Sequence, residues 1–183
     1  KVEEIKKQDE SIYAIIIEPL SASTLKKSDN YFLKNVRKLC SDENIILIYD
    51  EIYSGWCKTG KLFNFISSDT IPDILVYAKS FGGGKASISG YTARDQVMIK
   101  TYDNPDDFSL QSSTYNGFGE ECITAIEAIN ILVENNYEKK SLENGKILNN
   151  ILKTAKKEFP NIIDEIRGSG SFQGFTLKNP LNP

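Results

Sequence analysis

Short apolar runs alternate with amphipathic stretches along the first half of the chain. Residues 13–17, 45–49 and 74–78 are continuous apolar runs rich in Ile, Val, Leu and Tyr. They are too short for ordinary helices, and strands of this kind are typical of parallel sheets whose faces are covered by helices. Alternating polarity over residues 86–93 indicates one more strand, less deeply buried. The pattern predicts an α/β fold with a mainly parallel sheet.

Helical periodicity separates and follows these runs. Ser28 and Asp29 are suited to cap a helix, and apolar residues recur behind them at helical spacing: Phe32, Val36, Leu39 and Cys40. Residues 120–134 and 148–159 repeat apolar positions in the same way, which predicts two amphipathic packing helices. We place a domain boundary at residues 135–137, followed by a helix and by strands near residues 162–167 and 171–177.

Composition narrows the chemistry that the chain can perform. The 183 residues include 22 Lys plus Arg and 25 Asp plus Glu, a formal net charge of −3, and no basic block that would favour nucleic acid. Histidine is absent, which excludes Ser-His-Asp and Cys-His nucleophile systems and His-ligated zinc. Catalysis would have to use Lys, Asp, Glu or Tyr.

The same survey gives expectations about metals and location. The three cysteines are an odd number without metal-ligand spacing, so we expect no metal site. The longest apolar runs are far shorter than the roughly 20 residues that span a bilayer, and the first residues are charged where a secretory signal would be apolar. We therefore expect a cytoplasmic protein that does not cross a membrane.

The predicted parallel strands end in charged residues. Glu18, Asp50 and Lys79 each follow one apolar run directly, and ligands of open α/β sheets bind outside the carboxyl ends of the strands. Taken singly, each has an ordinary structural explanation: a turn residue, a cap and a solvated loop lysine. The spacing from Asp50 to Lys79, 79 − 50 = 29 residues, and the glycines that follow Lys79 make the set more selective.

This order of residues resembles fold-type I pyridoxal-phosphate enzymes, and in particular the class III aminotransferases. The resemblance covers residues 13–177 and is carried by these short blocks: Glu18-Pro19, Asp50-Glu51-Ile52-Tyr53, Lys58-Thr59-Gly60, Pro72-Asp73, Lys79-Ser80 with Gly82-Gly83-Gly84, Ser113-Thr114 and Arg167-Gly168. It implies a three-layer αβα large domain, of which residues 1–135 would be a part. Residues 136–183 would begin a small α+β C-terminal domain that is truncated here.

The family resemblance assigns a role to each residue at the strand ends. Lys79 matches the lysine that forms a Schiff base with pyridoxal 5′-phosphate and then moves the substrate proton. Asp50 matches the carboxylate that keeps the ring nitrogen protonated, and Ile52 the aliphatic residue that packs against the ring. Tyr53 stands where many members carry Gln beside the phenolic oxygen of the ring, so its hydroxyl is a candidate substitute. Glu18 would steady Tyr53 from outside the cofactor contacts.

Further along the chain, Ser113 and Thr114 match a segment that reaches across the family's dimer interface to the cofactor phosphate of the neighbouring subunit. The resemblance thus implies a homodimer with shared active sites. Leu20-Ser21-Ala22-Ser23-Thr24 replaces the second glutamate and glycines of many members, which argues against ordinary glutamate or ornithine specificity.

The functional hypothesis is transfer of an amino group between an amino donor and an oxo acceptor. Two alternatives stay open: an aminomutase like the glutamate-1-semialdehyde enzymes, and a non-catalytic homologue that serves as a dimerisation or scaffold module. We expect the 183 residues to be the central part of a longer chain and to be catalytically incomplete alone. Donor, acceptor and pathway are not specified by the sequence.

Overall fold

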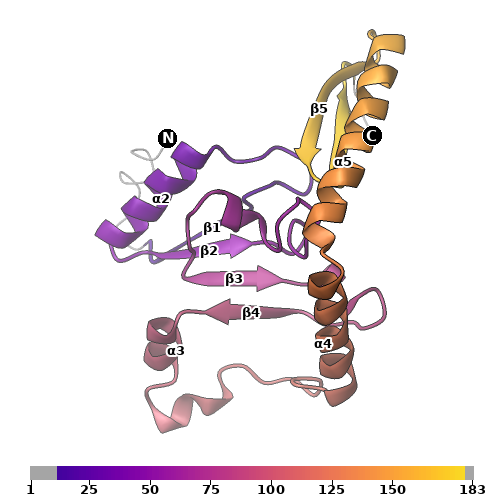
Figure 1. Ribbon diagram of the computed structural model, residues 1–183. Helices are drawn as coiled ribbons and strands as arrows, with labels where there is room; N and C mark the ends of the chain where they lie inside the picture. Colours follow the sequence, from indigo (N-terminus) through magenta and orange to yellow (C-terminus); the bar gives the residue numbers. More distant parts are fainter. Residues whose placement is uncertain (1–11, 180–183) are drawn as a thin grey trace.

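The computed structural model describes residues 12–179 of the chain (Figure 1). Its helices, 3₁₀ turns (η) and strands follow in the order β1 Ala14–Ile17, α2 Asn30–Asp42, β2 Ile46–Asp50, η1 Asn64–Ser67, β3 Ile74–Tyr77, η2 Lys79–Gly82, β4 Gly90–Ala93, α3 Asp95–Thr101, η3 Pro105–Ser109, α4 Gly119–Glu134, α5 Tyr137–Glu158, β5 Ile163–Ser169 and β6 Phe172–Leu177. Within residues 12–179, no helix is long and apolar enough to cross a membrane.

A four-stranded sheet in the order β1-β2-β3-β4 forms the centre of the fold. β1, β2 and β3 are parallel, and β4 closes the sheet antiparallel to β3. The predicted mainly parallel α/β sheet is therefore confirmed. Parallel neighbours place their carboxyl ends at one edge of the sheet, and Figure 1 shows β2 and β3 pointing toward the side on which α4 and α5 stand.

Helix α2 covers one face of this sheet, as its apolar periodicity predicts. The Asp29 carboxylate caps it by accepting from the backbone N–H groups of Tyr31 and Phe32 at 2.8 and 3.3 Å. The core beneath the helix consists of fully or nearly fully buried side chains from α2, β2 and β3: Leu33, Val36, Cys40, Leu47, Tyr49 and Leu75. Burial of these side chains fixes which face of each strand points toward α2.

The opposite face of the sheet has less cover than the apolar runs predict. Ile16, in β1, is 64% exposed, and burial along β2 alternates between buried and half-buried residues. The continuous apolar runs place hydrophobic side chains on both faces of the sheet. Within residues 12–179, a helix covers only one of these faces.

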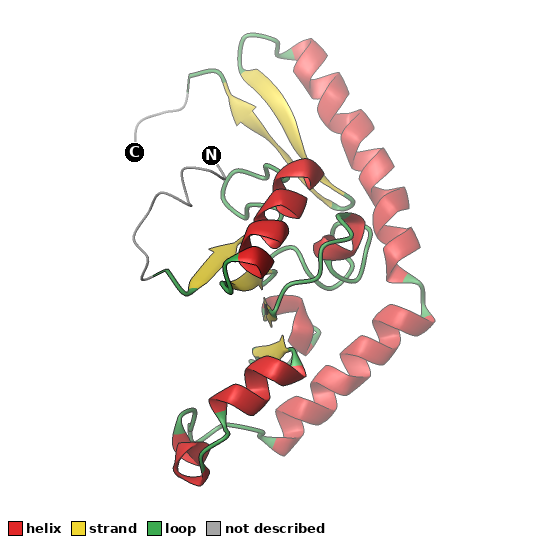
Figure 2. Cartoon of the chain, turned by 90° about the vertical axis from the view of Figure 1, so that its left-hand side faces the viewer, coloured by secondary structure: helices red, strands yellow, loops and turns green. Residues whose placement is uncertain are grey.

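Two long helices and a hairpin form the C-terminal part of the chain. α5 packs on the antiparallel pair β5-β6, and Figure 2 shows α4 and α5 meeting at an angle beside the sheet. Gly145 allows this contact, because a Cβ atom there would strike the backbone carbonyl of Gly170 in the hairpin turn. Much of the apolar surface of α4 and α5 is exposed, including Ile123 at 69% and Ile147 at 61%. Both segments therefore form helices, as their apolar periodicity predicts, but part of each apolar face is not covered within residues 12–179.

One local prediction needs correction, and one helix was not predicted. The alternating stretch 86–93 forms a strand only over its second half, Gly90–Ala93, because residues 86–89 follow the turn after η2 without regular secondary structure. Helix α3 lacks a sequence signal, since none of its seven residues is buried and no apolar stripe marks it.

Asp73 ties the entry of β3 to three other elements. Its Oδ2 accepts from the Leu47 N–H and from Arg37 Nη1, both at 2.8 Å, and its Oδ1 lies 3.4 Å from Arg94 Nε. The Asp73 side chain is only 13% exposed, so solvent screens these contacts weakly. One carboxylate thus links β2, α2 and the end of β4.

We predict that Asp73→Ala lowers the free energy of unfolding of the complete protein by about 2–3 kcal/mol, because a partly buried guanidinium and a strand N–H both lose their acceptor. Urea unfolding followed by circular dichroism measures this change. Lys38→Ala is the control: it removes an exposed ion pair within α2 and should change the free energy of unfolding far less. Equal effects of the two substitutions would contradict the role given to Asp73.

Candidate active site

The carboxyl ends of three adjacent strands bring the predicted site residues to one edge of the sheet. Asp50 is the last residue of β2 and is paired with Val76 of β3, and the next N–H, that of Glu51, donates to the Val76 carbonyl at 2.9 Å. Lys79 begins η2 three residues beyond Val76. Glu18 follows β1, the neighbour of β2 on the other side. The parallel register thus aligns the three ends.

Lys79 extends over the aromatic ring of Tyr53. Its Nζ atom lies 4.2 Å from the ring centroid, a cation–π distance, and the other partner of this ring is Phe172 of β6, with ring centroids 6.1 Å apart. Lys79 also has a φ of 53°, a left-handed conformation that is uncommon for a residue with a side chain. Such backbone strain is found where a fold holds a functional side chain in place.

Asp50 is a half-buried carboxylate whose polar contact is local. Its Oδ1 accepts from the backbone N–H of Ile52 at 2.9 Å, and no basic side chain in residues 12–179 forms an ion pair with it. Ile52 is half-buried and Tyr53 is 45% exposed. The Asp50–Tyr53 segment therefore offers an acceptor, an aliphatic side chain and a phenol at the same edge.

Glu51, the neighbour of Asp50, faces the interior and organises the loop that follows. Its carboxylate is fully buried and accepts from Ser54 Oγ at 2.9 Å and from the N–H groups of Asn64 and Phe65 at 2.6 and 2.7 Å. Burial raises the pKa of Glu51, although the three hydrogen bonds favour the charged form. No role for Glu51 is evident from the sequence, because side-chain direction at the end of a strand depends on tertiary packing.

A second lysine stands close to Lys79. The half-buried Lys58 donates from Nζ to the hydroxyl of Ser80, the residue after Lys79, at 3.2 Å. Burial lowers the pKa of Lys58, and the positive charge of Lys79 acts in the same direction. In the sequence, Lys58 belongs to the block Lys58-Thr59-Gly60 that carries part of the family resemblance. Nothing in that pattern connects it to Lys79, since no spacing rule joins the two lysines.

Glu18 is exposed and accepts from the Ala22 N–H at 2.6 Å, and no hydrogen bond within residues 12–179 joins it to Tyr53. The contact predicted for Ser113 and Thr114 is with the cofactor phosphate of a neighbouring subunit and stays a prediction. Ser113 and Thr114 lie in the exposed segment between η3 and α4, and no contact in the described part of the chain joins them to Asp50 or Lys79. The structure thus places Asp50, Ile52, Tyr53 and Lys79 at the same edge of the sheet, and Ser113 and Thr114 in a separate exposed segment.

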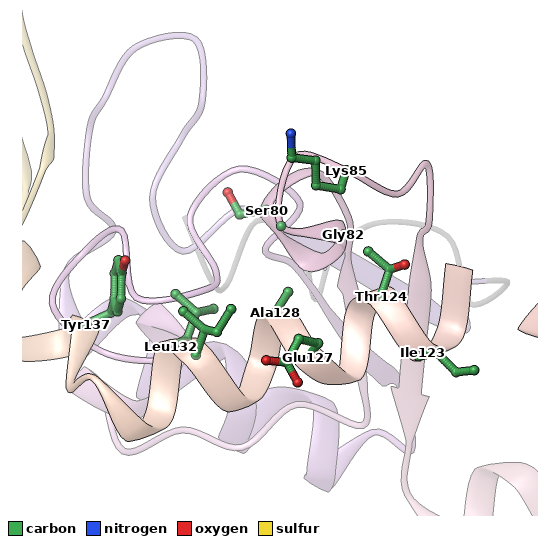
Figure 3. A pocket seen from close by; sticks show the side chains of 12 residues that line it. Ser80, Gly82, Lys85, Ile123, Thr124, Glu127, Ala128, Leu132 and Tyr137 are labelled. Atoms are coloured by element: carbon green, nitrogen blue, oxygen red, sulfur yellow. The ribbon is translucent and has the colours of Figure 1, made fainter. Parts of the chain in front are cut away.

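A cavity lies between the turn after Lys79 and helix α4 (Figure 3). It has a volume of about 710 Å³ and its lining includes Ser80, Gly82, Ile123 and Ala128 but not Lys79. Gly83 has a φ of +59°, and a Cβ atom on it would lie 2.9 Å from the Ala128 Cβ. The glycines after Lys79 therefore serve a left-handed turn and a close approach to α4.

Comparison with known families matches the whole chain. Residues 1–183 match the family model described as aminotransferase class-III. The chain belongs to the class III aminotransferases. The resemblance found in its short motifs is thereby confirmed, and so is the fold type.

Solved aminotransferase structures share this fold. An ornithine aminotransferase from Toxoplasma gondii is 29% identical, with a TM-score of 0.82 over 97% of this chain and 40% of its own. The ornithine aminotransferase from Plasmodium yoelii is 26% identical, with a TM-score of 0.82 over 97% of this chain and 45% of its own. An (S)-enantioselective omega-transaminase from Thermomicrobium roseum is 25% identical, with a TM-score of 0.87 over 96% of this chain and 39% of its own. This chain spans less than half the length of these structures.

Class III aminotransferases use pyridoxal 5′-phosphate, and the Toxoplasma enzyme is described with partial occupancy of this cofactor at its active site. The residues at the sheet edge of this aminotransferase chain fit such a group. Asp50 offers a carboxylate and Lys79 an amine, and neither has an oppositely charged partner within residues 12–179. Both are therefore free to bind a molecule that carries a basic ring nitrogen and an aldehyde.

The buried Glu51 predicts a pH-dependent stability. Its folded-state pKa lies above the ordinary value of 4.5, so the unfolded chain releases this proton at a lower pH than the folded chain does. The wild type should therefore lose stability relative to Glu51→Gln as the pH rises from 4.5 through the raised pKa.

Urea unfolding of both proteins at a series of pH values measures this difference. Glu120→Gln, which changes an exposed carboxylate at the start of α4, should follow the wild type through the same range. If the free energies of unfolding of wild type and Glu51→Gln differ by the same amount at every pH, the raised pKa of Glu51 is contradicted.

Proposed function

We propose that this chain supplies the cofactor-binding centre of a pyridoxal-phosphate-dependent aminotransferase, which moves an amino group from an amino donor to an oxo acceptor. The proposal rests chiefly on the edge where β2 and β3 end, with the Asp50 carboxylate on one strand and Lys79 directly after the other. Family membership supports it, because the matched structures include several transaminases.

The cofactor, when bound, supplies an aldehyde that captures amines and a ring that withdraws electrons from the substrate. Lys79 would hold the cofactor through its Nζ atom and, once displaced by an amino substrate, would take up and return the proton of the substrate carbon. The Tyr53 ring below the ammonium group restricts where this lysine can point. Lys79 can take up this proton only as a neutral amine.

Asp50 would accept a hydrogen bond from the protonated ring nitrogen and stabilise its positive charge. The Ile52 N–H already fixes one carboxylate oxygen, Oδ1, so the side chain is oriented before any ligand arrives. Ile52 would pack against one ring face and exclude water, and the Tyr53 hydroxyl would donate to the phenolic oxygen. Glu18 would act only through the turn that it closes.

In this proposal residues 1–135 form part of the cofactor-binding large domain, and residues 136–183 begin the small C-terminal domain. The break at Asn136 supports this division: the residue is left-handed at a φ of 50°, and its side chain caps α5. The replacement at Leu20–Thr24 supports a donor other than glutamate or ornithine.

Substitution at Lys79 and Asp50 separates cofactor capture from turnover. We predict that borohydride reduction fixes pyridoxal phosphate on the peptide containing residue 79 in the wild type and in Asp50→Asn, but not in Lys79→Ala. Asp50→Asn should lose on the order of a hundredfold or more in kcat, because the charge that stabilises the protonated ring is gone.

Mass spectrometry of the reduced complete protein and a transamination assay with a substrate pair accepted by the wild type provide the measurements. Lys85→Ala and Asp69→Asn are matched controls at exposed positions and should behave like the wild type. Labelling of Lys79→Ala, or full turnover of Asp50→Asn, would refute the assigned roles. Absence of label in the wild type would favour the scaffold alternative.

We further propose a homodimer in which Ser113 and Thr114 bind the cofactor phosphate of the partner subunit. Their exposure within this chain and their separation from Lys79 support an intersubunit role. Hydroxyl groups and backbone N–H groups in an exposed loop are suitable donors to a phosphate.

For Thr114→Ala we expect about a tenfold weaker affinity for pyridoxal phosphate, from loss of one hydrogen bond to a charged group. Fluorescence titration of the cofactor-free protein measures the affinity, and light scattering checks the dimer. Ser109→Ala, upstream in η3, serves as the control with an unchanged affinity. A monomer that binds the cofactor with full affinity would contradict the shared site.

A further inference from the structure

Lys58 is a charged side chain in a place that burial makes unfavourable. It is half-buried, and its Nζ donates to Ser80 Oγ at 3.2 Å. No carboxylate within residues 12–179 pairs with it, and the nearest charge that acts on it is the ammonium group of Lys79. Desolvation and like charge both oppose an ammonium group here, so the bond to Ser80 is its compensating contact.

The backbone at Lys58 is held firmly by the C-terminal part of the chain. The Lys58 carbonyl accepts from Ser141 Oγ of α5 at 2.8 Å and from the Ser171 N–H of the β5-β6 turn at 3.0 Å. The two preceding residues, Trp56 and Cys57, are left-handed at φ values of 61° and 66° and are both buried. The backbone from which the Lys58 side chain projects is therefore fixed by α5 and the β5-β6 turn.

Ser80 belongs to the turn that carries Lys79. Figure 3 shows Ser80 and Gly82 on this turn above helix α4. The turn is built from few internal bonds, among them Phe81 N–H to Ala78 O and Gly83 N–H to Ser80 O, both at 3.1 Å. With Lys79 itself in a left-handed conformation, the turn benefits from an outside contact that holds it in shape.

We infer that Lys58 is a positioning residue for Lys79: its ammonium group holds Ser80, and thereby the turn that presents the Lys79 amine at the sheet edge. The inference rests on the proposed function for the meaning of Lys79, whereas the contact itself joins two residues of this chain and can be tested separately. Lys58 touches neither the predicted ring-binding residues nor Lys79 directly in the contacts of the described chain.

Hydrogen–deuterium exchange of the complete protein, prepared without cofactor, tests this role in peptides covering residues 78–86. Lys58→Met should speed exchange there by about threefold to tenfold, the loss expected for one ordinary hydrogen bond. Lys58→Arg keeps a charged donor and should return exchange to within about twofold of wild type. Lys61→Met removes an exposed lysine of the same loop and should leave these peptides unchanged.

Ser80→Ala provides a second route to the same contact if Lys58→Met does not fold, which thermal unfolding will reveal. It should speed exchange as Lys58→Met does, and the double variant should show no further increase. Exchange in folded Ser80→Ala equal to wild type would overturn the inference. So would wild-type exchange in folded Lys58→Met, or a failure of Lys58→Arg to restore protection.

Borohydride labelling of the same preparations after cofactor is added separates the two proposals. If the wild type is not labelled at residue 79, the proposed function fails, whereas the exchange result still reports on the contact. If the wild type is labelled and Lys58→Met is labelled at an equal rate, Lys58 does not position Lys79. We expect labelling of Lys58→Met to be about tenfold slower than in the wild type, while Lys58→Arg approaches the wild-type rate.

Discussion

The register between two parallel strands determines where the functional groups of this chain stand. Asp50 pairs with Val76, and the Glu51 N–H extends the pairing by one bond beyond β2. A shift of one residue would turn Asp50 toward the covered face and Glu51 away from its three donors. The packed core beneath α2 prevents that shift, because Leu47, Tyr49 and Leu75 would lose their burial.

Adjacent acidic residues take opposite tasks for the same reason. Asp50 stays half-buried at the sheet edge, and Glu51 points inward to hold residues 54–65. Glu51 thus shapes the start of the loop from which Tyr53 and Lys58 reach the Lys79 turn. Loop and turn then meet through two contacts: the Tyr53 ring with the Lys79 ammonium group, and Lys58 with Ser80. The C-terminal hairpin supports both, because Phe172 stacks on Tyr53 and Ser171 binds the Lys58 carbonyl.

Membership in the class III aminotransferases agrees with this arrangement of Asp50, Tyr53 and Lys79 at one edge of the sheet. The solved relatives share the fold at TM-scores of 0.82 to 0.87, yet this chain covers only part of their length. Apolar side chains on α4 and on the open face of β1 are exposed within the described residues. The edge that carries Asp50 and Lys79 is nonetheless complete in its backbone pairing.

Local pattern in the sequence was enough for the three parallel strands and helix α2, and it made Asp50 and Lys79 candidates for the site. Apolar runs marked β1, β2 and β3, a cap and a stripe marked α2, and the residues after the strands identified Asp50 and Lys79. Helix α3 and the late start of β4 were not predicted, since neither segment has a periodic buried face. Only the tertiary structure decided that Glu51 turns inward, that Lys79 is left-handed above Tyr53, and that Lys58 meets Ser80. Those features depend on contacts between residues 13 or more positions apart or on the packing around one side chain, and hydrophobic periodicity carries no information about either.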